Sequence, residues 1–393
     1  MKILFDHQIF TLQNYGGISR YYSELMRHLN RTPGVQAELS LKYSDNVYLK
    51  DLGLEEFQVL PLNAGLGIGG HGPIKRKAER ALRAAGVLRD EAASQRRNEA
   101  ASLRRVKGCR FDIFHPTYYD TYYIRHVRRP LVVTIYDLIH EFYPEHFPLA
   151  DEVRLHKRQL LRRASIVITI SQTTKRDLQT FYGVDPGKVA VTLLGNSLDG
   201  QAAPPEDGHS RHTPPEPPER FILYVGPRTG YKNFYFSLLA LEGLLKGDKE
   251  LFLVCAGGGE FNSQERRLLS TLGLREKVLH FGAGDASLRR LYSRARLFLL
   301  PSLYEGFGLP LVEAMSCGCP VLASNRGALP EIGGGAARYF DPKDAAGMAA
   351  AVKEIIGGKG LREELKSRGL VQASKYSWAE TARQTLEIYR KLS

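Results

Sequence analysis

The stretch that decides the fold runs from Pro301 to Glu331 and reads PSLYEGFGLPLVEAMSCGCPVLASNRGALPE. It places two glutamates, Glu305 and Glu313, on either side of the turn Gly306-Phe307-Gly308. Leu309-Pro310 then opens a predicted short helix, because proline is favourable in a first helical turn, where its missing N–H would be unpaired anyway. The free N–H groups of such a turn and the helix dipole form an anion-binding site.

This combination of groups indicates a particular class of ligand. Backbone amides of the turn can bind a diphosphate, and a carboxylate on each side can accept hydrogen bonds from sugar hydroxyls. The segment lacks the lysine of a Walker motif and the glycine fingerprint of a dinucleotide fold. The residues therefore favour a nucleotide-sugar site, and the alternative is a loop–helix junction whose glutamates are merely solvated.

The spacing Glu305-x7-Glu313, with EGFGLPLVEAMSCGCPVLAS around it, closely resembles the retaining GT-B glycosyltransferases of family 4. The resemblance covers essentially the whole chain. It implies that Glu313 binds the donor ribose and that Glu305 lies beside the transferred sugar. The amides that it places at the phosphate and the sugar are those of Phe307, Gly308 and Leu309.

A second feature is a pair of cations, Arg228 and Lys232, in a turn between a predicted strand and a predicted helix. Two positive charges there can neutralise a diphosphate and stabilise it as it departs. In the resembled family a basic pair at this turn does so without a metal, so the resemblance implies no cofactor and no metal site. The alternative is an exposed turn with two surface cations.

Another glycine turn, Gly16-Gly17, lies between the first predicted strand and its helix. Adjacent glycines let a backbone approach a ligand closely. The turn resembles the N-domain glycine loop of the family, so we expect Gly17 at the donor phosphate and Gly16 at the acceptor. The resemblance also places Gly257 under the nucleotide and Ala283 near its base.

The sequence departs from the family at Tyr136, where many relatives carry a histidine that contacts the transferred sugar. Either Tyr136, Asp137 or His140 takes that role, or the sugar is held differently. His115 ends another predicted strand at the same edge, where it contacts substrate or only caps the strand. Tyr118 belongs to an aromatic stretch that suits a saccharide acceptor but also suits interdomain packing.

The length of 393 residues suggests two or three domains, and 43% hydrophobic content supports sizeable cores. No apolar stretch approaches the roughly 20 residues of a membrane-spanning helix. The start MKILFDH enters a strand at once, so we expect no signal peptide. Four cysteines make no disulfide framework, and Cys317-x-Cys319 lacks further ligands for a metal, so a reduced, cytoplasmic compartment fits.

The net charge of +13 is uneven, because residues 75–107 hold eleven Lys or Arg against four Asp or Glu. Interleaved alanines and leucines predict a helix or helical hairpin there. Two interpretations stay open: a solvated helical face, or a surface that rests on anionic lipid headgroups at the inner face of the cell membrane. Each basic residue near such a surface gains about 1 kcal/mol. No recognisable nucleic-acid motif accompanies the charge, so we expect no nucleic-acid partner.

Strands and helices alternate on both sides of a proline-rich segment, residues 200–220, which predicts an α/β fold of GT-B type with two doubly wound, Rossmann-like domains facing a cleft. We expect an acceptor-side domain over 1–199, a linker or loop over 200–220, and a nucleotide-sugar domain over 221–375. By resemblance, the helix within 376–393 crosses back to the first domain. The predicted strands are Lys2-Asp6, Ala37-Leu41, Phe111-His115, Leu131-Ile135, Ile166-Ile170 and Val189-Leu193, then Phe221-Val225, Leu251-Ala256, Val278-Phe281, Leu297-Leu300 and Val321-Ser324.

The sequence thus predicts a retaining hexosyltransferase that uses a donor of the UDP-glucose or GDP-mannose type and a glycan or lipid-linked saccharide acceptor, as in surface polysaccharide synthesis. Two alternatives stay open. One is a nucleotide-sugar epimerase or a sugar phosphorylase on the same architecture, and the other is a catalytically silent carbohydrate- or lipid-binding protein. The predicted catalytic residues are Arg228, Lys232, Glu305 and Asp137.

Overall fold

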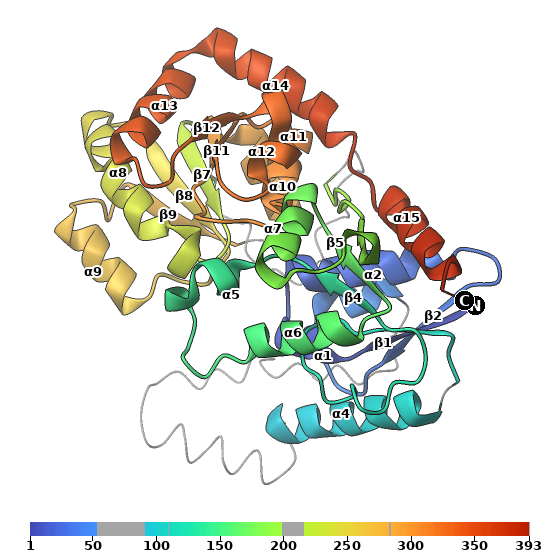
Figure 1. Ribbon diagram of the computed structural model, residues 1–393. Helices are drawn as coiled ribbons and strands as arrows, with labels where there is room; N and C mark the ends of the chain where they lie inside the picture. Colours follow the sequence, from blue (N-terminus) through green and yellow to red (C-terminus); the bar gives the residue numbers. More distant parts are fainter. Residues whose placement is uncertain (53–90, 109, 199–215, 283, 393) are drawn as a thin grey trace, which may run out of the picture.

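The computed structural model describes residues 1–52, 91–108, 110–198, 216–282 and 284–392. The chain forms two α/β halves, with the first half drawn below the second in Figure 1. Most of the predicted linker, part of the basic segment and Ala283 lie outside the described residues. Within the described ranges, no helix is both long and apolar enough to cross a bilayer.

The first half is built on parallel strands arranged as two neighbouring groups, β2-β1-β3 and β4-β5-β6. A single parallel bridge between Phe114 and Leu131 connects the groups. Most of these strands are short apolar runs of buried residues, as is typical of parallel sheets, whereas the edge strand β2 is polar and only partly buried. Their bounds are β1 Lys2–Asp6, β2 Gln36–Ser40, β3 Ile113–His115, β4 Val132–Ile135, β5 Ile166–Thr169 and β6 Val189–Val191.

The second half contains one six-stranded parallel sheet in the order β12-β11-β10-β7-β8-β9. All five strands predicted for this half are present, with ends within one residue of the prediction. The edge strand β12 was not predicted, because it has only three residues and one of them is an exposed arginine. The bounds are β7 Phe221–Val225, β8 Phe252–Ala256, β9 Val278–Phe281, β10 Leu297–Leu300, β11 Val321–Ser324 and β12 Arg338–Phe340.

Helices follow the strands and cover the faces of both sheets (Figure 1). In the first half they are α1 Gln8–Leu12, α2 Gly17–Asn30, α4 Glu91–Gly108, α5 Ile139–Phe142, α6 Val153–Arg163 and α7 Gln172–Tyr182. In the second half they are α8 Phe234–Gly247, α9 Ser263–Thr271, α10 Asp285–Arg294, α11 Leu309–Ser316, α12 Leu329–Gly333, α13 Ala345–Gly357 and α14 Lys359–Ala373. Short 3₁₀ turns occupy Val47–Leu52, Pro144–His146, Pro186–Lys188, Gly230–Lys232 and Gly334–Ala336.

The helix α15, Trp378–Arg390, returns from the second half and packs against α2 of the first (Figure 1). The Trp378 indole N–H donates to Ser197 Oγ at 2.9 Å. The Tyr389 hydroxyl lies 2.6 Å from Nδ1 of His115. The prediction that the C-terminal helix crosses back to the first domain is therefore confirmed, and the core of the first half is completed by residues that follow the second half in the chain.

His115 belongs to that core, so the prediction that it contacts substrate is wrong. Its side chain has no exposed surface. Besides Tyr389, its ring nitrogens face the hydroxyls of Thr134 at 2.9 Å and Tyr22 at 3.3 Å. Burial lowers the pKa of His115 to about 3, because the interior disfavours the charged imidazolium. A neutral histidine here links β3 to α15 and α2.

This burial predicts an acid-dependent loss of stability. Below pH about 6.5 the unfolded chain binds a proton at His115 that the folded chain refuses, until the pH approaches the folded pKa of about 3. The free energy of unfolding should therefore fall with decreasing pH by about 1.4 kcal/mol per pH unit from this residue alone. We expect His115→Gln to remove that part of the slope in urea unfolding between pH 6.5 and 4. Equal slopes for both proteins would contradict this account.

Candidate functional site

The order of the second sheet reverses between β7 and β10, which pair in parallel although they are far apart in the chain. In open α/β sheets, ligands bind outside the carboxyl ends of the strands at such a switch point. The chain leaving β7 carries Lys232, and the chain leaving β10 carries Glu305. Two of the predicted catalytic residues thus lie at the place where this fold binds ligands.

Lys232 and Glu305 form an ion pair in which Lys232 Nζ donates to Glu305 Oε1 at 2.6 Å. The hydroxyl of Ser302 donates to the same oxygen, also at 2.6 Å. Burial by itself would lower the pKa of Lys232, but the charge and hydrogen bond of Glu305 more than offset it, so the pKa is raised. The side chains keep 19% and 14% exposure, so a fixed cation remains accessible at the switch point.

The turn between the two glutamates requires glycine at both glycine positions. A Cβ on Gly306 would lie 1.8 Å from the carbonyl oxygen of Tyr136 in the first half. Gly308 has a φ of +91°, and a Cβ there would lie 2.5 Å from Leu329 Cδ2. In the part of the chain that the structure describes, the N–H groups of Phe307, Gly308 and Leu309 meet no hydrogen-bond acceptor. They are available to an anion, although their role toward phosphate stays a prediction.

The glycine turn of the first half faces this same segment. A Cβ on Gly17 would lie 3.0 Å from Leu309 Cδ1, so the start of α2 lies against the start of α11. Gly16 directly precedes α2 and its carbonyl accepts the N–H of Arg20 at 3.0 Å. The structure therefore brings the predicted glycine loop and the predicted glutamate turn together, as the sequence patterns suggested separately.

Glu313 lies on α11 and keeps only 8% exposure. Burial raises its pKa, and the charge of Arg20 opposes that shift. Arg20 comes from α2 and donates to Asp285 Oδ1 at 2.5 Å and to the Tyr48 hydroxyl at 2.9 Å. Arg20 was not predicted from the sequence. Its position three residues after Gly17 places it on the first turn of the helix that follows the glycine loop, and this position was the available signal.

Asp137 approaches the site from the first half, with 30% of its side chain exposed. Its charge contributes to the raised pKa of Lys232, which places the two groups within electrostatic reach. Beneath it, the fully buried Lys157 donates to the Asp137 carbonyl at 2.9 Å and to Glu141 Oε2 at 3.0 Å. Lys157 was also missed, because a lysine on α6 looks like an ordinary surface residue in the sequence. The half-buried Tyr118 ring lies nearby and stays a candidate for the acceptor.

Tyr136 does not replace the family histidine, and its predicted contact with the sugar is wrong for the side chain. The ring is 4% exposed, and its hydroxyl donates to the Thr117 carbonyl at 3.2 Å. It therefore points into the core of the first half, and only its backbone carbonyl faces Gly306. The His140 ring is stacked on Phe147, which leaves Asp137 as the exposed polar side chain of this turn.

Arg228 is arranged differently from Lys232. It is 3% exposed, and its Nε donates to Glu265 Oε1 at 2.9 Å. Its other N–H groups donate to the carbonyls of Gly257 at 2.8 Å and Gly259 at 2.7 Å. The guanidinium thus holds the glycine turn after β8, and its charge is matched by Glu265. The action of Arg228 on the diphosphate stays a prediction. The position of Gly257 under the nucleotide also stays a prediction.

One further carboxylate joins the two halves. Glu331, on α12, accepts the backbone N–H groups of Gln172 and Thr173, each at 2.7 Å. These are the first residues of α7, where free N–H groups and the helix dipole favour a negative charge. Among the described residues, no group of three or more His, Cys, Asp or Glu is placed to hold a metal ion.

Comparison with known proteins identifies the family. Residues 15–196 match the model described as "Glycosyltransferase Family 4", and residues 207–371 match "Glycosyl transferases group 1". The chain is 30% identical over 315 residues to O-antigen chain mannosyltransferase B of Escherichia coli, an alignment that spans 75% of this chain and 78% of that protein. The chain belongs to the glycosyltransferase family that these two models describe. It is also 31% identical over 246 residues to the MMP alpha-(1->4)-mannosyltransferase of Mycolicibacterium hassiacum, covering 61% of this chain and 57% of that protein.

Solved structures show that this glycosyltransferase has the GT-B fold, as predicted. Sucrose-phosphate synthase from Thermosynechococcus elongatus superposes with a TM-score of 0.71 at 20% identity, over 100% of this chain and 99% of that one. Anabaena HepE, solved in complex with UDP and glucose, gives a TM-score of 0.71 at 20% identity, over 100% of both chains. At such identities the likeness establishes the fold alone.

The close approach at Gly306 predicts that Gly306→Ala separates the two halves of the glycosyltransferase, because the added Cβ would overlap the Tyr136 carbonyl. Overpacking of this kind costs about 1–3 kcal/mol. We expect a lower free energy of unfolding in urea and reduced sugar transfer. Gly243→Ala is the matched control, because a Cβ there meets nothing within 4 Å. A Gly306→Ala enzyme as stable and active as that control would contradict the described contact.

Proposed function

We propose that this glycosyltransferase moves a hexosyl group from a nucleoside diphosphate sugar to a saccharide or lipid-linked saccharide, with retention of configuration and without a metal. The observation that carries the proposal is the Lys232–Glu305 pair at the switch point of the second sheet. The amides of the neighbouring turn and Asp137 of the first half support the same site. A diphosphate needs a fixed cation and free N–H donors, and the transferred sugar needs carboxylates.

In the proposed reaction, the acceptor hydroxyl oxygen forms a bond to the anomeric carbon while the bond from that carbon to the diphosphate oxygen breaks. The leaving diphosphate takes the acceptor proton on the same face of the sugar. Lys232 and the amides of Phe307–Leu309 stabilise the negative charge that develops on the diphosphate. No covalent intermediate with a carboxylate is required.

The remaining side chains orient the substrates. Glu305 is held by Lys232 and Ser302, so its carboxylate has a fixed position from which to bind sugar hydroxyls. Glu313 binds the ribose, with Arg20 supplying an opposing charge that favours the ionised carboxylate. Asp137 faces the sugar from the acceptor side. Holding both substrates between two halves that contact each other also excludes water from the reacting atoms.

The names of the relatives favour mannose as the transferred sugar and a polysaccharide as the product. The relative that aligns with this chain over 315 residues is an O-antigen chain mannosyltransferase. We therefore propose GDP-mannose as the donor to test first and UDP-glucose second, since HepE was solved with UDP and glucose. We propose a cytoplasmic enzyme that reaches acceptors at the inner face of the cell membrane, where the basic segment 75–107 would contact anionic lipid.

The test of this function is calorimetric titration with GDP, UDP, ADP and dTDP and with their mannose and glucose conjugates, first without metal and then with Mg²⁺, followed by a transfer assay with the conjugate that binds. Binding without metal, and transfer that yields the same anomeric configuration as the donor, would support the proposal. If the protein bound none of these compounds, the proposed donor site would be refuted. Inversion of configuration would refute the proposed mechanism while leaving the site intact.

Lys232→Ala should lower kcat by at least about tenfold, equivalent to about 1.4 kcal/mol of barrier, because the departing diphosphate loses its nearest fixed cation. Lys246→Ala on α8 is the control, since that lysine is exposed and pairs with Glu242 of the same helix. Initial rates at saturating donor measure the effect. Wild-type kcat in the Lys232→Ala enzyme would show that the cation does not act on the leaving group.

Glu313→Gln should weaken nucleotide-sugar binding by about tenfold, because a charged acceptor of ribose hydroxyl hydrogen bonds becomes a neutral one of the same shape. The free energy of unfolding should change less than the free energy of binding, because burial of a charged carboxylate already destabilises the folded protein. Calorimetry with the donor found above gives the affinity. An unchanged Kd would refute the ribose role while sparing that of Lys232.

A further inference from the structure

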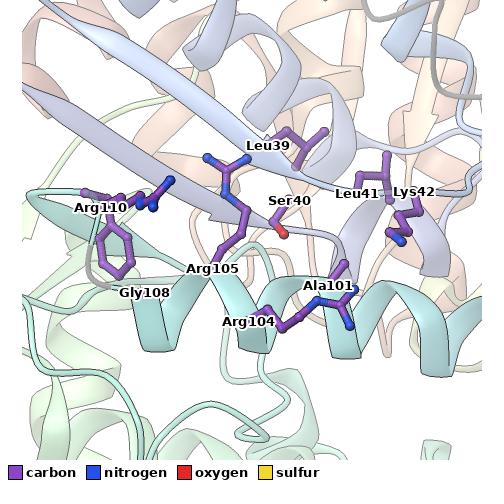
Figure 2. A pocket seen from close by; sticks show the side chains of 10 residues that line it. Leu39, Ser40, Leu41, Lys42, Ala101, Arg104, Arg105, Gly108 and Arg110 are labelled. Atoms are coloured by element: carbon purple, nitrogen blue, oxygen red, sulfur yellow. The ribbon is translucent and has the colours of Figure 1, made fainter.

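A hollow of about 650 Å³ lies between β2, the edge strand of its group, and α4 (Figure 2). Four of its lining residues are cations and none is acidic. In Figure 2 the Arg105 side chain extends from α4 toward β2, while Lys42 and Arg110 approach from the two ends. The residues of this hollow contribute nothing to the Lys232–Glu305 site, so its charge needs a separate explanation.

The cations of the hollow are mostly uncompensated. Arg105 pairs with Glu38, which also contacts Lys2 at 3.3 Å. By contrast, the side chains of Lys42, Arg104 and Arg110 donate to no acceptor within the described ranges. Cations gathered around one space repel one another unless an anion joins them. The arrangement therefore provides three free cationic groups for one negatively charged ligand.

Ser40 gives an independent indication of a ligand. The residue is 3% exposed, and its hydroxyl is buried with no hydrogen-bond partner among the described residues. Figure 2 shows this oxygen pointing from β2 toward α4, into the hollow. A buried hydroxyl without a partner costs about 1–3 kcal/mol. An anionic oxygen entering between the cations would accept its hydrogen bond and remove that cost.

We propose that this hollow binds a phosphate ester. Arg104 and Arg110 supply planar guanidinium groups, which suit phosphate oxygens geometrically, and Lys42 adds a point charge. Leu39 and Leu41 also lie at the hollow, but their side chains point away from α4 and belong to the core of the first half. The phosphate comes from a lipid headgroup or from a soluble phosphate ester. The site is separate from sugar transfer. Its lipid-headgroup source rests on the proposed contact of segment 75–107 with anionic lipid, whereas its soluble source does not.

The test uses the full-length protein and two probes: glycerol 3-phosphate in solution, followed by calorimetry, and vesicles of phosphatidylcholine with or without phosphatidylglycerol, followed by co-sedimentation. The triple variant Lys42→Gln, Arg104→Gln, Arg110→Gln should lose at least about tenfold in affinity for whichever probe the wild type binds. Loss confined to glycerol 3-phosphate identifies a soluble ester as the source, and loss confined to phosphatidylglycerol vesicles identifies the lipid headgroup. Wild-type affinity of the triple variant for both probes would overturn the proposal.

Two matched variants separate a built site from net charge alone. Lys353→Gln, Lys359→Gln, Lys366→Gln removes the same charge from exposed positions on α13 and α14 and should leave probe binding unchanged. Ala101→Phe fills the hollow but keeps every charge, and should lower affinity as the triple variant does. Melting temperature and donor-nucleotide binding confirm that each variant is folded. Equal loss in the α13–α14 variant, or wild-type affinity in Ala101→Phe, would show that the hollow is not the site.

Discussion

The site depends on one contact between backbones. Gly306 of the second half lies so close to the Tyr136 carbonyl of the first half that no side chain fits between them. This contact fixes the distance between Glu305, which precedes the glycine, and Asp137, which follows the tyrosine. Groups from the two halves can then act on one sugar. A catalytic site divided between two halves needs its reacting groups to be held at a fixed separation.

Two further contacts reinforce this reference by electrostatics. Glu331 binds the free N–H groups at the start of α7, and Arg20 bonds to Asp285 across the same boundary. Each pairs a charge from one half with a complementary group from the other.

The two cations predicted to act on the donor, Arg228 and Lys232, have different partners. Arg228 is committed to Glu265 and the glycine turn, whereas Lys232 keeps part of its surface exposed beside Glu305. One organises the site and the other remains available to a ligand.

The sequence predicted the strands, the GT-B fold and the Glu305–Glu313 turn because these depend on local patterns. Buried parallel strands are short apolar runs, and the turn combines glycines, proline and carboxylates at fixed spacing. The errors at His115 and Tyr136 share a cause. Both residues lie at the carboxyl end of a strand, at the edge of the sheet where a ligand is expected. Their side chains instead point into a core that includes Tyr389, more than two hundred residues away in the chain. Local pattern carries no information on such contacts. Arg20 and Lys157 were missed for the same reason, since only the folded chain shows what neutralises them.

The return of α15 to the first half has a consequence for how the protein is made. Tyr389 and Trp378 complete a core whose other parts are translated first, and the whole of the second half lies between them in the chain. While the ribosome is still synthesising the second half, the first half lacks a helix and exposes the apolar face of α2 that α15 covers. The first half therefore cannot complete its core until α15 has been synthesised, which is after the whole of the second half.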